Sequence, residues 1–284
     1  MSLDIEQSVL KTLPKMQKEV ASLLDALKQD FVEPKVLEGK LIACPVISGR
    51  VLQIANSSFY GLSREISSIR EATIILGQHT LRSLVYSLAA MDEFKDSKQA
   101  ETEGALNYKI IWQHSLYSAC LARVFADYKK LNASDIFTAA LFEHFGILIL
   151  ETIESEKIKQ AMNLTLETKQ SFKSTIHKLT ELNYISLSAK ALDYWHFPVS
   201  VCELIQSVKD DISSSECSEE CSDETKIMLL SNTIASVFLS SPLSHGYSFI
   251  SKQALDVVKS KKDLIRSLEQ ADILYSQMAS NFIG

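Results

Sequence analysis

Two cysteines come nearest to the spacing of a metal site in this sequence. Cys217 and Cys221 flank a Ser-Glu-Glu spacer inside the acidic stretch 210–224. A structural zinc ion needs about four ligands, and the sequence has no second pair at a matching spacing. We therefore interpret the stretch as a loop and expect no metal there.

The short motifs that catalysis often uses are missing from the sequence. It has no Gly-rich phosphate loop, no Gly-x-Ser-x-Gly turn and no His-Glu-x-x-His zinc helix. Serine, histidine and aspartate are plentiful, but a catalytic triad is defined by geometry, which composition does not give. The local motifs therefore predict no cofactor.

The composition is that of an ordinary globular protein. The 284 residues are 46% hydrophobic and 23% charged, with a formal net charge of −6. This acidic balance argues against nucleic acid as a partner, because phosphate binding depends on Lys and Arg. Two short basic runs, at 129–130 and 259–262, are interpreted as solvated helix ends.

Hydrophobic stretches and cysteines give an expectation about location. No run approaches ~18 consecutive apolar residues, and the first residues lack the pattern of a secretory signal, so we expect a cytoplasmic protein without a membrane partner. Cys44, Cys120 and Cys202 lie in apolar helical patterns, where a reduced cysteine acts as a small hydrophobic residue.

Apolar spacing predicts an all-α fold. Val20, Leu23, Leu24 and Leu27 recur with a period near 3.6, while alternating runs with hairpin signals are scarce. Only 8 Gly and 5 Pro are present, which is few for the tight turns of an all-β protein. Helices are expected over 14–27, 45–56, 68–76, 79–94, 110–125, 134–150, 155–163, 167–182, 185–195, 198–208 and 225–239, followed by one or two more.

Several segments occur together in an order that resembles a known family. They are residues 13–14, 51–61 (Val-Leu-Gln-Ile-Ala-Asn-Ser-Ser-Phe-Tyr-Gly), 66–72, 75–77, 112–115, 139–146 and 192–198. Their order and separation resemble the HDOD family, a group of helical relatives of the HD phosphohydrolases. The resemblance implies a compact multi-helix HD-like bundle over 10–240, with an N-terminal helical subdomain (10–94), an HD-like subdomain (105–240) and a C-terminal helical extension (241–284).

The same resemblance identifies four positions of a former metal site. In active HD relatives a His, a His-Asp pair and a later Asp hold a divalent metal that activates water. Here His114 matches the first His, Glu143 and His144 stand at the His-Asp pair, and Asn232 stands at the later Asp. A neutral amide holds a hard cation less strongly than a carboxylate does, so these are interpreted as vestigial positions without a metal.

Two alternatives remain at this point. His114, Glu143 and His144 are themselves competent ligands, so an unusual site could serve a metal-dependent phosphohydrolase acting on a nucleotide or cyclic dinucleotide. Against this, adjacent residues on one helix point about 100° apart, and Glu143 and His144 would not simply exchange roles with a His-Asp pair. Nucleotide binding without hydrolysis is the second alternative.

The function that the resemblance implies is bacterial signal transduction. We expect a non-catalytic regulatory module that binds a protein signalling partner, or a nucleotide or other small ligand in the degenerate pocket. The segment with Asn56, Ser57, Phe59, Tyr60 and Gly61 has two interpretations. Its polar residues can cap a helix and its glycine can turn the chain, or its aromatic residues can form a contact surface.

Overall fold

The computed structural model describes residues 18–27, 29, 31–57, 60, 65–95, 108–168, 170–209, 221–239 and 257–282. Within these ranges the chain forms twelve helices and no strand, which confirms the all-α prediction. The helices belong to two compact units. One contains Pro14–Ala100 and Ile273–Gly284, and the other contains Met1–Leu13 and Glu101–Asp272.

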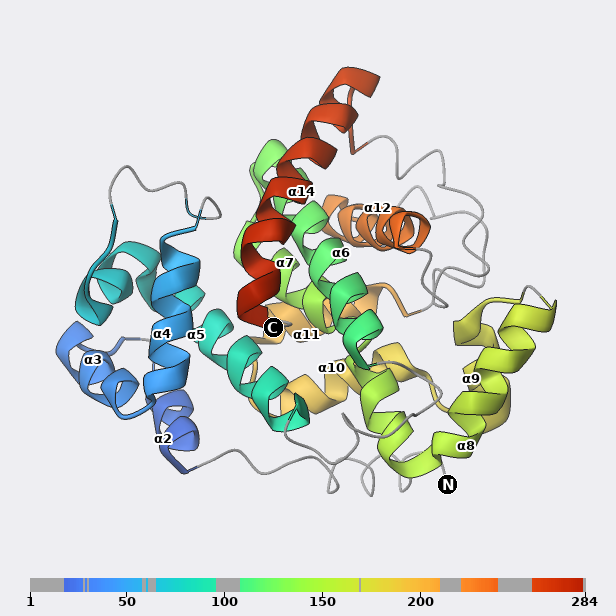
Figure 1. Cartoon of the computed structure of the whole chain (residues 1–284), viewed down its shortest axis with the longest axis horizontal. Helices are drawn as coiled ribbons and strands as arrows, with labels where there is room; N and C mark the ends of the chain where they lie inside the picture. The colour runs from blue at the N-terminus through green and yellow to red at the C-terminus, as the bar shows by residue number, and fades with distance from the viewer. Residues whose placement is uncertain are drawn as a thin grey trace. The chain divides into compact units, whose positions relative to one another are not determined.

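The unit that contains Pro14–Ala100 is organised around one long helix. Its helices are α2 (Lys18–Leu27), α3 (Pro34–Ile42), α4 (Pro45–Ala55) and α5 (Ile69–Lys95). The first three each pack against α5 (Figure 1). Aliphatic side chains fill the space between them, and the fully buried ones include Leu23, Leu27, Leu37, Leu41, Val51, Ile54, Leu81 and Val85.

Local signals in the sequence set the ends of these helices. Pro45 occupies the first turn of α4, where its missing N–H needs no partner. Ser68 Oγ accepts a hydrogen bond from Glu71 N at 3.1 Å and so caps the start of α5. Gly77 interrupts α5 with φ 74° and ψ 160°, a left-handed φ that favours glycine. The sequence predicted that one helix ends before Gly77 and another begins after it. In the structure Gly77 interrupts the single helix α5.

The other unit holds seven further helices. They are α6 (Tyr108–Lys129), α7 (Ala133–Phe142), α8 (Phe145–Thr168), α9 (Phe172–Thr180), α10 (Tyr184–Tyr194), α11 (Val199–Ser207) and α12 (Asp223–Phe238). Helix α6 packs against α7 and α12, and α10 packs against α8 and α11 (Figure 1). Two tyrosines of α6 bind α14 (Lys261–Phe282): Tyr117 Oη donates to Asp272 at 2.6 Å, and Tyr128 Oη donates to Asp263 at 3.4 Å.

The expected single helix over 134–150 is wrong, because the chain breaks at Glu143 and His144. Ser188 of α10 causes the break by entering the backbone hydrogen-bond ladder. Its hydroxyl accepts from Gly146 N at 2.6 Å and donates to the Glu143 carbonyl at 2.9 Å. A side chain inserted into a helix ladder ends or bends the helix, so α7 ends at Phe142 and α8 begins at Phe145.

Gly146 permits the close approach of α8 and α10. A Cβ atom at this position would lie 2.0 Å from the Tyr184 carbonyl oxygen, a separation that no packed carbon tolerates. The glycine therefore lets the two backbones touch and brings the Ser188 hydroxyl within reach of the break.

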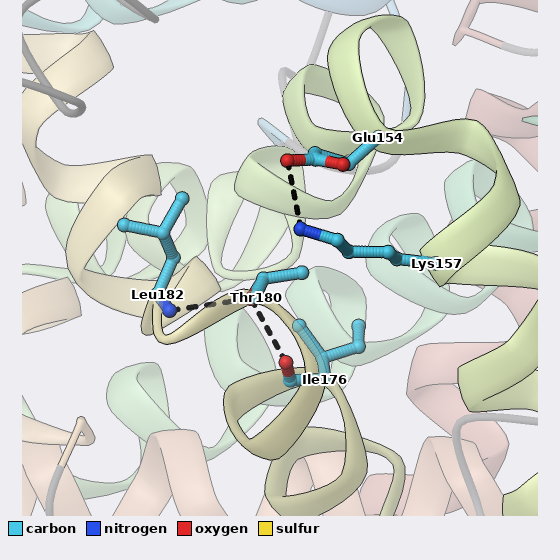
Figure 2. Close-up of polar contacts among 5 residues, drawn as sticks. All are labelled: Glu154, Lys157, Ile176, Thr180 and Leu182. Carbon is cyan, nitrogen blue, oxygen red and sulfur yellow. Dashed lines mark hydrogen bonds and ion pairs between the residues drawn. The ribbon is translucent and has the colours of Figure 1, made fainter.

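The expected helices near 155–163 and 167–182 are also wrong in their bounds, since α8 continues to Thr168. It bends at Glu154 (φ −135°, ψ 38°), and Lys157 Nζ binds Glu154 Oε1 at 3.0 Å across the bend (Figure 2). Figure 2 also shows the turn after α9, where the Thr180 hydroxyl donates to the Ile176 carbonyl and accepts from Leu182 N. Asn183 then caps α10 by accepting from Ile185 N and Ser186 N.

One stretch in the described ranges, Ala133–Thr168, is long and apolar enough to cross a membrane by length and composition alone. It comprises α7 and α8 and is broken at residues 143–144. Its most apolar window is 83% buried inside the protein, as is usual for core helices.

The close contact at Gly146 gives a first prediction. Gly146→Ala should destabilise the protein by ~3 kcal/mol, because the added carbon forces two backbones apart. Gly39→Ala and Gly49→Ala are matched controls, since they lie in helices and their added carbons meet open space. These should be neutral or slightly stabilising. Urea unfolding measures all three, and equal stability of Gly146→Ala and the controls would contradict the contact.

Candidate functional site

The four positions matched to a former metal site lie together in one buried cluster. His114 comes from the middle of α6, Glu143 and His144 from the break between α7 and α8, and Asn232 from α12. None of these residues is more than 2% exposed. They meet because α6 packs against both α7 and α12. We call this group the buried polar cluster.

The Asn232 amide joins the two residues at the helix break. Its Nδ2 donates to Glu143 Oε1 at 2.9 Å, and its Oδ1 lies 3.1 Å from His144 Nε2. The amide offers a donor and an acceptor side by side without carrying a charge. An ionised carboxylate at this position could accept a proton from Glu143 but would bury a negative charge in the cluster, which is unfavourable. The neutral Asn232 side chain therefore suits both Glu143 and His144.

His114 completes the cluster from the side of α6. Its Nε2 is hydrogen-bonded to Ser236 Oγ at 3.0 Å, and its ring lies 4.9 Å from the His144 ring with an angle of 32° between the planes. The Tyr184 ring lies against His144, with its centre 5.7 Å away. Two imidazoles at this separation inside a protein would repel each other if both were charged.

Burial keeps the whole cluster uncharged. It raises the pKa of Glu143 to about 8, against which the positive charge of Lys173 acts only weakly. It lowers the pKa of His144 to about 4, and burial together with His144 holds the pKa of His114 well below its ordinary value. At neutral pH the cluster therefore contains a protonated carboxyl, an amide and two neutral imidazoles.

The position of the break changes the argument about Glu143 and His144. The expectation that the two side chains diverge assumed that both lie inside one helix. In the structure they occupy the turn between two helices, and both reach the same Asn232 side chain. The structure thus brings together the residues that the sequence predicted. They are hydrogen-bonded to one another and do not surround a common point.

Sequence reasoning missed the residues that position this cluster. Ser236 lies one helical turn after Asn232, so its contact with His114 could have been found from helical spacing. Ser188 is 45 residues from Glu143, and no pattern in the sequence signals its bond to the Glu143 carbonyl.

The segment 56–61 is described only in part. Asn56 Nδ2 donates to the Ile66 carbonyl at 2.8 Å, and Asn56 Oδ1 accepts from Ile66 N at 2.6 Å. Ser57 Oγ donates to the Ile54 carbonyl. These polar side chains close the loop that leads to α5, and Tyr60 is half-buried. Phe59 and Gly61, like Pro14 and Cys217, lie outside the described residues, so the contact-surface interpretation stays a prediction.

The cluster does not suit the divalent metal that an HD-type site would hold. Such a cation needs unprotonated nitrogen or oxygen lone pairs directed at one point. Here His144 Nε2 and Glu143 Oε1 are both bonded to the Asn232 amide and His114 Nε2 is bonded to Ser236, so in the described part of the chain the cluster's ring nitrogens without a hydrogen-bond partner are the two Nδ1 atoms. Over the described ranges no group of three His, Cys, Asp or Glu residues is arranged to hold a metal ion.

Comparison with known families identifies the class of this protein. Residues 12–210 match the HDOD domain model, so the chain belongs to the HDOD family. This confirms the resemblance drawn from the sequence segments. No curated protein is significantly similar to the chain in sequence.

Solved structures show the same fold. A proposed phosphohydrolase from Shewanella amazonensis is 20% identical with a TM-score of 0.70, and the alignment covers 98% of this chain and 97% of that one. An HDOD domain protein of unknown function from Geobacter sulfurreducens is 22% identical (TM-score 0.64; 98% and 95% covered). A proposed signal transduction protein from Marinobacter aquaeolei is 17% identical (TM-score 0.62; 96% and 64% covered).

The protonated state of Glu143 predicts an unusual pH dependence. The folded protein keeps this proton up to a pKa of about 8, whereas the unfolded chain releases it near 4.5. Unfolding therefore releases a proton between these values, and stability falls as pH rises through the range. Glu143→Gln keeps the acceptor for Asn232 and has no proton to lose. Its stability relative to the native protein should rise by on the order of 3 to 4 kcal/mol between pH 5 and 8.

Urea unfolding at a series of pH values measures this difference. Glu167→Gln makes the same substitution at an exposed position of α8 and is the control. The two histidines act on the acid side, where the unfolded chain takes up protons below pH ~6.5 and stability falls toward pH 4. A difference for Glu143→Gln that does not change with pH would mean that Glu143 is ionised in the folded protein.

Proposed function

We propose that this HDOD-family protein is a non-catalytic regulatory module of bacterial signal transduction that works in the cytoplasm by binding a partner protein. The observation that carries the proposal is the Asn232 amide, which binds Glu143 and His144 at once in the protein interior. The groups that would serve metal-dependent hydrolysis are therefore used to hold three helices together.

Burial adds a second argument against chemistry at this place. Hydrolysis requires that water and a phosphoester reach the reacting groups, and polar ligands enter sites that are open to solvent. His114 and Glu143 are 0% and 1% exposed. A phosphate group would reach them only if α6, α7 and α12 separated, which would expose the core of the unit.

A second candidate function is metal-dependent hydrolysis of a nucleotide or cyclic dinucleotide. One observation favours it: the fold does bring two imidazoles and a carboxyl together, with the rings of His114 and His144 4.9 Å apart. If the Asn232 bonds opened, these groups could turn toward a cation. Binding of a nucleotide without hydrolysis would need the same opening.

Metal binding and turnover discriminate these functions. Millimolar Mn²⁺, Mg²⁺, Fe²⁺ or Ni²⁺ should leave the melting temperature of the native protein unchanged, and phosphoester and cyclic dinucleotide substrates should not be cleaved, because no three ligand groups in the described ranges are arranged around one point. The triple variant Glu143→His, His144→Asp, Asn232→Asp restores the metal-binding pattern and is the positive control. Metal-dependent turnover by the native protein that His114→Ala abolishes would overturn the proposal.

A further inference from the structure

A hollow between α2 and α3 is open to solvent and has a volume of about 500 Å³. This is within the usual size range of binding pockets. We call it the α2–α3 groove and define it by its lining residues. They are Lys18, Ala21, Ser22, Asp25, Ala26, Gln29, Val32, Val36 and Lys40.

Small side chains on α2 explain the hollow. Ala21, Ser22 and Ala26 lie on the face of α2 that is turned toward α3, as their spacing of one and four residues shows. On the other side stand Val32 and Val36, so the apolar part of the lining comes from these valines and the alanines of α2. Val36 is 46% exposed although valine is a good core residue. The groove thus leaves apolar surface in contact with solvent.

Side chains of α5 bind backbone groups beside the groove. Gln78 Oε1 accepts from Val32 N at 2.9 Å, and Gln78 Nε2 donates to the Gln29 carbonyl. Arg82 Nη1 donates to the Leu27 carbonyl at 3.2 Å. Phe31 lies between the two residues that Gln78 holds, and its side chain is 76% exposed. An exposed aromatic side chain next to Val32, whose backbone N–H is held by Gln78, suits the role of an interface anchor.

The charge of the groove differs from that of the protein. The chain has a net charge of −6, but among the described residues that line the groove two are basic, Lys18 and Lys40, and one is acidic, Asp25. Lys40 of α3 donates to Ser22 Oγ of α2 at 2.8 Å, so one ammonium group lies across the groove between the two helices. Positive groups beside exposed apolar side chains complement a segment with apolar and acidic residues.

We propose that the α2–α3 groove is a docking surface for a short segment of another protein, in which apolar residues are flanked by Asp or Glu. The inference rests on the proposed function and deepens it by naming the surface and the chemistry of the partner. Apolar side chains of the segment lie on Val32 and Val36 and against Phe31. Its carboxylates pair with Lys18 and Lys40.

Random 16-residue peptides displayed on phage and selected on the immobilised full chain test this inference. Enriched peptides should combine apolar residues with Asp or Glu, and their synthetic forms should bind more weakly as salt concentration rises, because screening weakens exposed ion pairs. Fluorescence anisotropy measures their affinity for the native chain and for each variant.

Variants on α3 and at Phe31, with control variants on α3, locate the binding surface. Lys40→Glu, Val36→Ser and Phe31→Ala should each weaken binding at least ~10-fold. Lys35→Glu and Ile42→Ser change the same residue types on α3 outside the groove, where both residues are exposed, and should change affinity less than ~2-fold. Far-UV circular dichroism and melting temperatures establish that each variant is folded.

Three results would overturn the inference: no enriched peptide, enriched peptides that are neutral or basic, or binding that the groove variants and their controls affect equally. None of these results concerns the buried polar cluster. Metal-dependent turnover by the native chain would instead contradict the proposed non-catalytic function. Failure of the docking inference and failure of the proposed function can therefore be told apart.

Discussion

The described HD-like part of this protein depends on how the interior accommodates an acid and two imidazoles without a counter-charge. Burying an ionised carboxylate far from water is very unfavourable unless it is paired. The protein meets this constraint by keeping Glu143 protonated and His144 neutral, with the Asn232 amide bonded to both. These polar side chains therefore form hydrogen bonds between helices. They do not supply the negative charge that would hold a cation.

The geometry of that interaction is set by contacts made elsewhere in the same unit. The Ser188 hydroxyl bonds to Gly146 N and to the Glu143 carbonyl, where a continuous helix would use backbone partners, and α7 ends at this point. Gly146 allows α10 to come close enough for this to happen. Because the break turns both Glu143 and His144 toward α12, the amide at Asn232 and the position of the turn belong to one arrangement.

The sequence predicted the helical class, the family and the starts of helices marked by Pro45 and Ser68, because periodicity and capping are local properties. It also identified His114, Glu143, His144 and Asn232, although only by resemblance. It placed one helix across the break at Glu143, since the hydroxyl that interrupts the ladder comes from a residue far away in the chain. The groove could not be foreseen either, because it arises where small residues of α2 face a loop that Gln78 of α5 holds.

The protonation of His144 tests the central claim most directly. Nitrogen NMR of the folded protein, with the His144 signals assigned, distinguishes the two neutral forms and the imidazolium. Since Asn232 Oδ1 accepts from His144 Nε2, the account predicts a neutral ring with its proton on Nε2 at pH 6, unchanged by added Zn²⁺. A charged ring, or a proton on Nδ1 with Nε2 free to bind the metal, would contradict it.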